Sequence, residues 1–129
     1  MNITLKGAPR SKKNSMVIAR NAKGRPFIMQ GQSYQQYEKD CLRQITGKYK
    51  LKINSPVNVK CIYYMPNHKR VDLGNLLAAT CDVLVKAGVL EDDNAKICVG
   101  HDGSRVLVDK ENPRVEITIE QVEVEPDAV

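Results

Sequence analysis

Residues 68–94 read HKRVDLGNLLAATCDVLVKAGVLEDDN, and the interpretation of the whole chain begins with this stretch. Side chains project about 100° apart along a helix, so the spacing of apolar residues indicates which side faces a core. By this measure one side is apolar and consists of Leu73, Leu76, Leu77, Thr80, Val83, Leu84 and Ala87. A separate polar ridge consists of Asp72, Asn75, Ala79, Asp82 and Lys86. The pattern predicts a core-facing helix over residues 72–87 that is stopped by Gly88.

Carboxylates stand at both ends of this predicted helix. Asp72 lies in the first turn, where the helix dipole favours an anion, and Glu91, Asp92 and Asp93 follow the helix in a loop. Neighbouring carboxylates repel one another unless they face water or a cation. Mg²⁺ takes oxygen ligands, typically one or two carboxylates together with water and substrate phosphate. If Asp72 and the acidic loop meet, they form a pocket for Mg²⁺, or for Mn²⁺ in its place, that supports phosphodiester hydrolysis.

A basic pair, Lys69–Arg70, directly precedes Asp72. This pair could hold a phosphate backbone or stabilise the negative charge that develops during hydrolysis. A simpler interpretation of the same stretch is an ordinary amphipathic helix, in which Asp72 satisfies the helix dipole and the acidic loop faces water. The pattern alone leaves both interpretations open.

The rest of the chain predicts a single small α+β domain with a mixed β-sheet and two main helices. A helix is expected at residues 31–46 and a hairpin at 16–20 and 25–29. The other expected strands are 2–6, 56–65, 96–100, 105–109 and 114–122. In the strand 56–65, one face carries Val57, Val59, Cys61 and Tyr63. Residues 1–122 are expected to form the domain, followed by a frayed tail at 123–129.

Charge is distributed unevenly along the 129 residues. Residues 1–70 carry 15 Lys or Arg and 2 Asp or Glu, whereas residues 71–129 carry 5 and 13. This asymmetry suits a protein that grips a polyanion with one set of groups and holds cations with another. A solubility pattern, or a basic surface that binds an acidic protein partner, would give the same asymmetry. The candidate DNA contacts are Lys12, Lys13, Asn14, Arg20, Lys23, Arg25, Lys69 and Arg70.

The cysteines and the termini exclude several classes of protein. Cys41, Cys61, Cys81 and Cys98 form no C-x-x-C pair, so we interpret them as reduced core residues. A zinc site fits poorly, because neither histidine stands at a zinc-finger spacing from two cysteines. The sequence has no secretory signal and no run near the roughly 18 apolar residues of a membrane span. We therefore expect a cytoplasmic protein with no membrane partner.

The tetrapeptide HDGS, residues 101–104, lies between two expected strands. We interpret it as a hairpin turn whose polar residues suit the turn geometry. In the alternative interpretation, His101 and Asp102 reach the metal site and Arg105 contacts a phosphate. Gly-rich phosphate loops of the Walker or dinucleotide type are absent from the sequence, as is a G-x-S-x-G motif.

Taken together, these motifs resemble those of the RusA-type Holliday junction resolvases. That family carries R-x-D-L-D-N-L-x-K, a helix, and then A-G-x-x-x-D-D. The matching residues in the first part are Arg70, Asp72, Leu73, Asn75 and Leu76. Those in the second part are Asp82, Ala87, Gly88, Asp92 and Asp93. An N-terminal P-x-S-x-N segment is matched more loosely by Pro9, Ser11 and Asn14.

The resemblance implies a homodimeric, Mg²⁺-dependent endonuclease of DNA recombination and repair, encoded by a bacterium, phage or prophage. Such enzymes nick opposed strands of a four-way DNA junction, with one active site for each strand. The resemblance assigns Asp72 and Asp93 to metal binding, with Asp92 beside them. We add Arg70 to this catalytic set because it precedes the first carboxylate and can contact phosphate.

The chain departs from the family pattern at Gly74 and Ala78. The family has its second Asp at the first position and often a catalytic Lys at the second. One explanation is a site built differently, with Asn75, Asp82, Asp92, His101 or Asp102 as auxiliary residues. Another is a chain that has lost catalysis and kept DNA binding, and a third is a sequence altered at these positions. The sequence leaves these explanations open.

Overall fold

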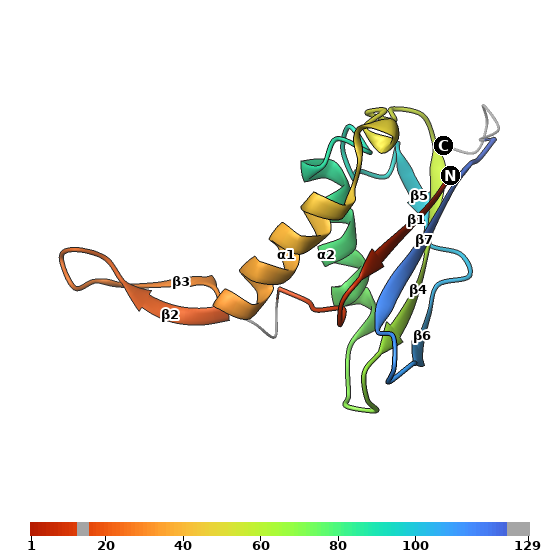
Figure 1. The fold of residues 1–129 in the computed structure, drawn as a ribbon. Coiled ribbons are helices and arrows are strands. Elements are labelled where there is room, and N and C mark those ends of the chain that lie inside the picture. The colour runs from red at the N-terminus through yellow and green to blue at the C-terminus, as the bar shows by residue number, and fades with distance from the viewer. Residues whose placement is uncertain (13–15, 124–129) are drawn as a thin grey trace.

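The main sheet is built around β4 (Val57–Met65). The computed structural model describes residues 1–12 and 16–123. On one side of β4 lies β7 (Arg114–Gln121), followed by β1 (Asn2–Lys6) at the edge, and both pairings are antiparallel. On the other side, β5 (Cys98–Gly100) and β6 (Arg105–Val108) pair with successive parts of β4 in parallel. The mixed sheet of the predicted α+β fold is therefore confirmed, and Figure 1 shows both helices on one face of it.

Alternating burial along the strands places the core between the sheet and the helices. In β4, Val57, Val59, Cys61 and Tyr63 are buried, as predicted, whereas the residues between them are half-buried. Side chains of a strand alternate between the two faces of a sheet, so the buried set shares one face. Strands β1 and β7 alternate in the same way, and they add Ile3, Leu5, Val115, Ile117 and Ile119 to the core.

The helix predicted from residues 68–94 is confirmed as α2 (Leu73–Lys86), with Asp72 as its N-cap. The prediction of an apolar, core-facing side of this helix is largely confirmed. The prediction that Ala79 belongs to the polar ridge is wrong, because this residue is only 2% exposed. The other predicted helix, α1 (Gln32–Gln44), lies along α2, and Nζ of Lys86 donates to Glu38 of α1 at 2.9 Å. Ala79 shares that side of α2 with Lys86 and is therefore covered by protein instead of water.

The hairpin expected around residues 101–104 is wrong. Strands β5 and β6 run in the same direction along one edge of β4, with Cys98 opposite Val57 and Arg105 opposite Ile62. The segment between them does turn, because the N–H of Ser104 donates to the carbonyl of His101 at 3.1 Å. A short turn between two short strands allows either arrangement, and pairing of both strands with β4 decides between them.

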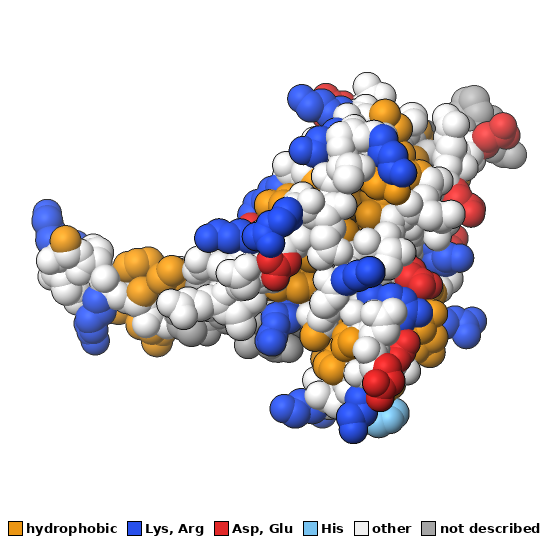
Figure 2. All heavy atoms as spheres, in the orientation of Figure 1, with side chains coloured by type: hydrophobic (Ala, Val, Ile, Leu, Met, Phe, Trp, Pro, Cys, Tyr) orange, Lys and Arg blue, Asp and Glu red, His pale blue; other side chains and the backbone are white. Residues whose placement is uncertain are grey.

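The predicted N-terminal hairpin is confirmed as β2 (Met16–Arg20) and β3 (Pro26–Gln30). In its turn, Oδ1 of Asn21 accepts hydrogen bonds from the N–H groups of Lys23 and Arg25 at 2.9 and 3.0 Å. Figure 1 shows this hairpin extending from the body as an arm. Ile18 and Ile28 are 75% and 70% exposed, and Figure 2 shows the apolar band on the arm between the body and the basic tip.

Some expectations fall outside the part of the chain that is described. Two of the predicted DNA contacts, Lys13 and Asn14, lie there, as does the tail expected at 123–129 apart from Glu123. Across residues 1–12 and 16–123, no helix is both long enough and apolar enough to cross a membrane.

Candidate functional site

The start of α2 forms an open polar hollow. Arg70, Val71, Asp72 and Asn75 line this hollow, which has a volume of about 380 Å³. Oδ1 of Asp72 accepts a hydrogen bond from the backbone N–H of Asn75 at 3.0 Å, so the carboxylate caps the helix. The N-terminal end of a helix carries partial positive charge, which favours an anion such as a carboxylate or a phosphate. The hollow thus combines a guanidinium, a carboxylate and an amide at a position suited to phosphate.

Gly74 and Ala78 lie on the side of the same helix start that is turned away from the core. A Cβ atom built on Gly74 would lie 3.2 Å from Oδ1 of Asp72. Ala78 follows one helical turn later, so residues 74 and 78 are neighbours on the helix surface. In this chain the two positions supply neither a carboxylate nor an amine.

The acidic loop, residues 91–94, is exposed throughout. Oδ1 of Asp92 accepts from the N–H of Asp93 at 2.7 Å, and its Oδ2 accepts from Nδ2 of Asn94 at 3.2 Å. These hydrogen bonds, the one from Asp93 first, lower the pKa of the Asp92 carboxyl below its usual value. The Asp92 carboxylate is therefore ionised at neutral pH, and both of its oxygens already have partners within the loop.

Asp72 and the acidic loop lie near opposite ends of β4. The loop leads into β5, whose Cys98 lies opposite Val57 at the start of β4, whereas Asp72 follows the end of that strand. The charge of Asp93 acts on the thiols of Cys81 and Cys98, which places Asp93 near the second half of α2. Within the described residues, Asp72, Asp92 and Asp93 do not form a set of ligand atoms within 4.8 Å of one another. The single pocket expected from the sequence is thus not formed by these three carboxylates in one chain, and their role as metal ligands stays a prediction.

The auxiliary residues have other partners. Oδ2 of Asp82 is paired with Nζ of Lys12 at 2.5 Å, which ties the N-terminal segment to α2. The N–H of Asp102 donates to Oδ1 of Asn58 at 2.8 Å, which fixes the turn after β5 against β4. His101 joins Cys81 and Cys98 in the one set of three potential metal ligands found among the described residues.

The family model of the endodeoxyribonuclease RusA matches residues 6–120 of the 129-residue chain. The chain belongs to the RusA endodeoxyribonuclease family. The matched range includes both helices, the whole of β4 to β6, the Asp72 cap and the acidic loop, so the resemblance drawn from residues 68–94 is confirmed. RusA-family proteins are, as a group, nucleases that resolve Holliday junctions. Among curated proteins, none matches the chain significantly.

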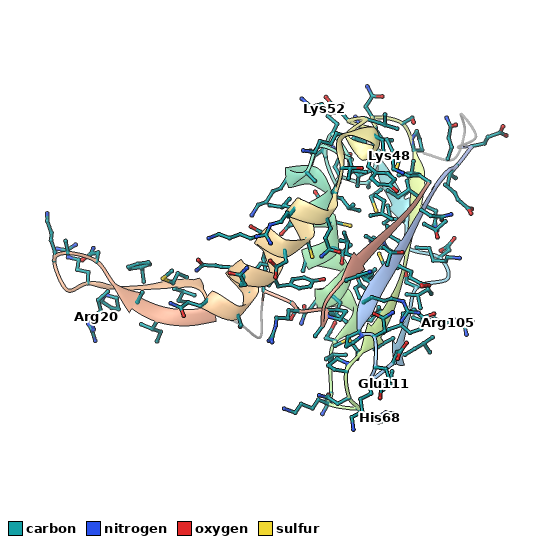
Figure 3. The ribbon with its side chains drawn as sticks, viewed as in Figure 1. Arg20, Lys48, Lys52, His68, Arg105 and Glu111 are labelled. Atoms are coloured by element: carbon teal, nitrogen blue, oxygen red, sulfur yellow. The ribbon has the colours of Figure 1, made fainter. Side chains whose placement is uncertain are left out.

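The described basic residues that we predicted as DNA contacts on this RusA-family chain include two separate exposed groups. Arg20, Lys23 and Arg25 are exposed at the tip of the hairpin arm, whereas Lys69 and Arg70 are exposed in the loop before α2. Figure 3 shows Arg20 on the arm and His68 at the foot of the body, well away from it. Two separated basic places suit a long polyanion better than a small anion.

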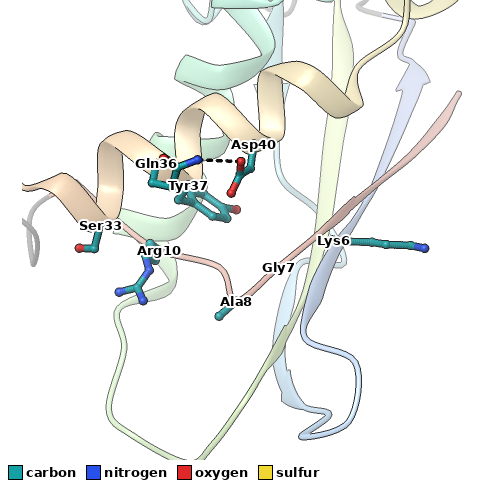
Figure 4. Close-up of a pocket in the computed structure, with 8 residues that line it drawn as sticks. All are labelled: Lys6, Gly7, Ala8, Arg10, Ser33, Gln36, Tyr37 and Asp40. Carbon is teal, nitrogen blue, oxygen red and sulfur yellow. Dashed lines mark hydrogen bonds between the residues drawn. The ribbon is translucent and has the colours of Figure 1, made fainter.

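Sequence reasoning missed a further hollow of about 280 Å³ between the N-terminal segment and α1. In Figure 4, Arg10 on one wall faces Ser33, Gln36 and Tyr37 on the other. Nε2 of Gln36 donates to Oδ1 of Asp40 at 2.9 Å along the rim. The RusA-family chain offers no motif here, because the hollow arises from the path of residues 6–10 past α1.

Proposed function

We propose that this RusA-family chain is a divalent-metal-dependent endodeoxyribonuclease that hydrolyses phosphodiester bonds at four-way DNA junctions. The observation that carries the proposal is the family match over residues 6–120, which includes both carboxylate motifs. The same match establishes that the chain belongs to a nuclease family. The metal, the ligands and the junction specificity of this chain are what we add.

The donor set fits Mg²⁺, with Mn²⁺ as the substitute. Asp72, Asp92 and Asp93 are exposed carboxylates, and hard oxygen ligands are what Mg²⁺ prefers. We assign metal binding to Asp72 and Asp93, with Asp92 beside them. When bound, the metal would polarise the phosphate and generate or orient the attacking hydroxide. Arg70, at the rim of the same hollow as Asp72, would contact the phosphate and stabilise its developing charge.

Asp72 and the acidic loop lie apart within one chain, but a homodimer can bring Asp72 of one copy close to the acidic loop of the other. We propose that the two copies are arranged so that Asp72 of one copy approaches Asp93 of the other. Such an arrangement gives one active site for each of the two strands that must be cut. The hairpin arm supports dimer formation, because Ile18 and Ile28 are strongly exposed and apolar surface of this kind favours association.

A second candidate is a catalytically silent protein that binds junctions. Gly74 and Ala78 favour it, because both lie beside the Asp72 hollow and neither supplies a reactive group. This candidate keeps the basic residues of the arm and of the loop before α2. It predicts binding that falls steeply with salt, because phosphate contacts release counterions.

A cleavage assay separates the two candidates. The chain would be incubated with a labelled synthetic four-way junction and Mg²⁺ or Mn²⁺, beside Asp93→Asn and the matched control Glu91→Gln from the same exposed loop. The proposal expects cleavage by the natural chain and by Glu91→Gln, and none by Asp93→Asn. Binding without cleavage under every metal condition would overturn the nuclease proposal in favour of the silent binder. Absence of both binding and cleavage would overturn both.

A further inference from the structure

Three side chains from separate parts of the chain meet behind β5. Cys81 lies on α2, Cys98 begins β5 and His101 follows β5. Their ligand atoms, the two Sγ atoms and a ring nitrogen of His101, all lie within 4.8 Å of one another. Cys81 is 4% exposed, and the other two residues are half-buried. The cluster is therefore largely shielded from solvent by protein.

A hydrogen bond sets the orientation of His101. Its Nδ1 lies 2.9 Å from the carbonyl oxygen of Val59 in β4. A carbonyl oxygen can only accept, so Nδ1 carries a proton, and the remaining nitrogen that can bind a metal is Nε2. That Nε2 lies 3.7 Å from Sγ of Cys98. Histidines that bind metals usually donate their other ring N–H to a carbonyl or carboxylate, which is the arrangement found here.

The spacing matches two ligands of one tetrahedral ion. With Zn–S near 2.3 Å and Zn–N near 2.0 to 2.1 Å, a tetrahedral site separates sulfur from nitrogen by about 3.6 Å. The observed separation between Sγ of Cys98 and Nε2 of His101 is 3.7 Å. A small adjustment of the side chains would therefore place an ion within bonding distance of both atoms.

Charge around the cluster also favours a cation. Sγ of Cys98 lies within 4.8 Å of Sγ of Cys81 and 3.7 Å from Nε2 of His101. The thiolate is the form of cysteine that binds metals. The Asp93 carboxylate is near enough for its charge to act on both sulfur atoms. A divalent ion there would relieve the repulsion among these groups.

We propose that Cys81, Cys98 and His101 bind a soft divalent transition-metal ion of the Zn²⁺ class, with water in the fourth position. Thiolate and imidazole ligands select such ions, whereas Mg²⁺ prefers oxygen, so this site is chemically distinct from the proposed carboxylate site. The ion would join α2 to the edge of the sheet. Metal binding at this cluster does not require nuclease activity.

Cobalt absorption tests the site directly, because Co²⁺ reports thiolate ligands in a tetrahedral zinc site. The full chain would be reduced, stripped of metal with a chelator and titrated with CoCl₂. We expect a thiolate-to-cobalt band and strong visible bands that saturate at one Co²⁺ per chain. Added Zn²⁺ should remove these bands, whereas a large excess of Mg²⁺ should not.

Ligand variants complete the test. Cys98→Ser and His101→Ala should each lower the affinity for Co²⁺ by about tenfold or more, since even outer partners of metal ligands matter at that level. The matched control is Cys41→Ala in α1, whose thiol is buried outside the cluster and which should keep the bands. Circular dichroism would establish that each variant is folded. Absence of the thiolate band in the natural chain, or its persistence in folded His101→Ala and Cys98→Ser, would overturn the proposal.

Discussion

A Cβ atom on residue 74 would lie 3.2 Å from Oδ1 of Asp72, so Gly74 occupies the position directly beside the helix-capping carboxylate. In the RusA motif that position carries a second Asp. Asp72 also lines the hollow formed with Arg70 and Asn75. Compared with the motif, the chain therefore keeps one carboxylate of two neighbouring positions.

Restoring the family residues should raise nuclease activity. The double variant Gly74→Asp, Ala78→Lys adds a carboxylate beside Asp72 and an amine one turn away. We expect its rate of junction cleavage to exceed that of the natural chain by roughly tenfold or more, since positioned catalytic groups commonly contribute at least that much. Single-turnover rates on a labelled junction would measure it. Equal rates would mean that residues 74 and 78 have no part in the chemistry of this chain.

Mixed dimers test whether each active site draws on both copies. A dimer of one Asp72→Asn chain and one Asp93→Asn chain retains one intact pair of carboxylates if the pair forms between copies. It retains none if the pair forms within a copy. We expect the heterodimer, isolated through two different affinity tags, to nick one strand of the junction while both variant homodimers are inactive. An inactive heterodimer beside an active natural dimer would contradict the arrangement.

The arm should contribute to DNA affinity through charge. Replacing Arg20, Lys23 and Arg25 with Gln should weaken junction binding and reduce the slope of log affinity against log salt by about 0.9 for each phosphate that the arm no longer neutralises. The matched control replaces Lys48, Lys50 and Lys52, which lie at the other end of the molecule, as Figure 3 shows for Lys48 and Lys52. Fluorescence anisotropy over a salt series would measure both. An unchanged slope in the arm variant would exclude the arm from the DNA interface.

An ion pair in the loop after β6 should affect stability at acid pH. Nη1 of Arg114 donates to Oδ2 of Asp109 at 2.8 Å, and this bond lowers the pKa of the Asp109 carboxyl. A carboxyl with a lowered pKa in the folded state stabilises the fold above its unfolded pKa. That contribution declines as the pH falls through the folded value.

Urea unfolding at a series of pH values would measure this effect. From about pH 6 down to about pH 3, stability should fall less steeply in Asp109→Asn than in the natural chain. In an Arg114→Gln background, the further change Asp109→Asn should leave the slope nearly unaltered. Identical acid slopes for the natural chain and Asp109→Asn would contradict the prediction.

Periodicity predicted the parts of the fold that depend on neighbours in sequence. The alternation in β4, the helix after Asp72 and the hairpin around Asn21 were all found where they were expected. Each of these three elements depends on a pattern of apolar residues, or on a turn residue, that is visible within a short stretch of sequence.

The features that sequence reasoning missed depend on neighbours in space. Ala79 is buried on the side of α2 from which Lys86 reaches α1, and residues 101–104 join two parallel segments because both pair with β4. The cluster of Cys81, Cys98 and His101 has no zinc-finger spacing, since one of its members lies on α2 and the others lie along β5. At the candidate active site, the motif identified the carboxylates, but it carried no information on how far Asp72 lies from the acidic loop.

The dependence of junction cleavage on Mg²⁺ concentration tests the central claim most directly. We expect the purified chain to nick a four-way junction at a rate that rises with Mg²⁺ and saturates, while Asp93→Asn remains inactive over the same range. Cleavage that is independent of Mg²⁺, or equal in Asp93→Asn and the natural chain, would contradict a metal-dependent nuclease that uses the acidic loop.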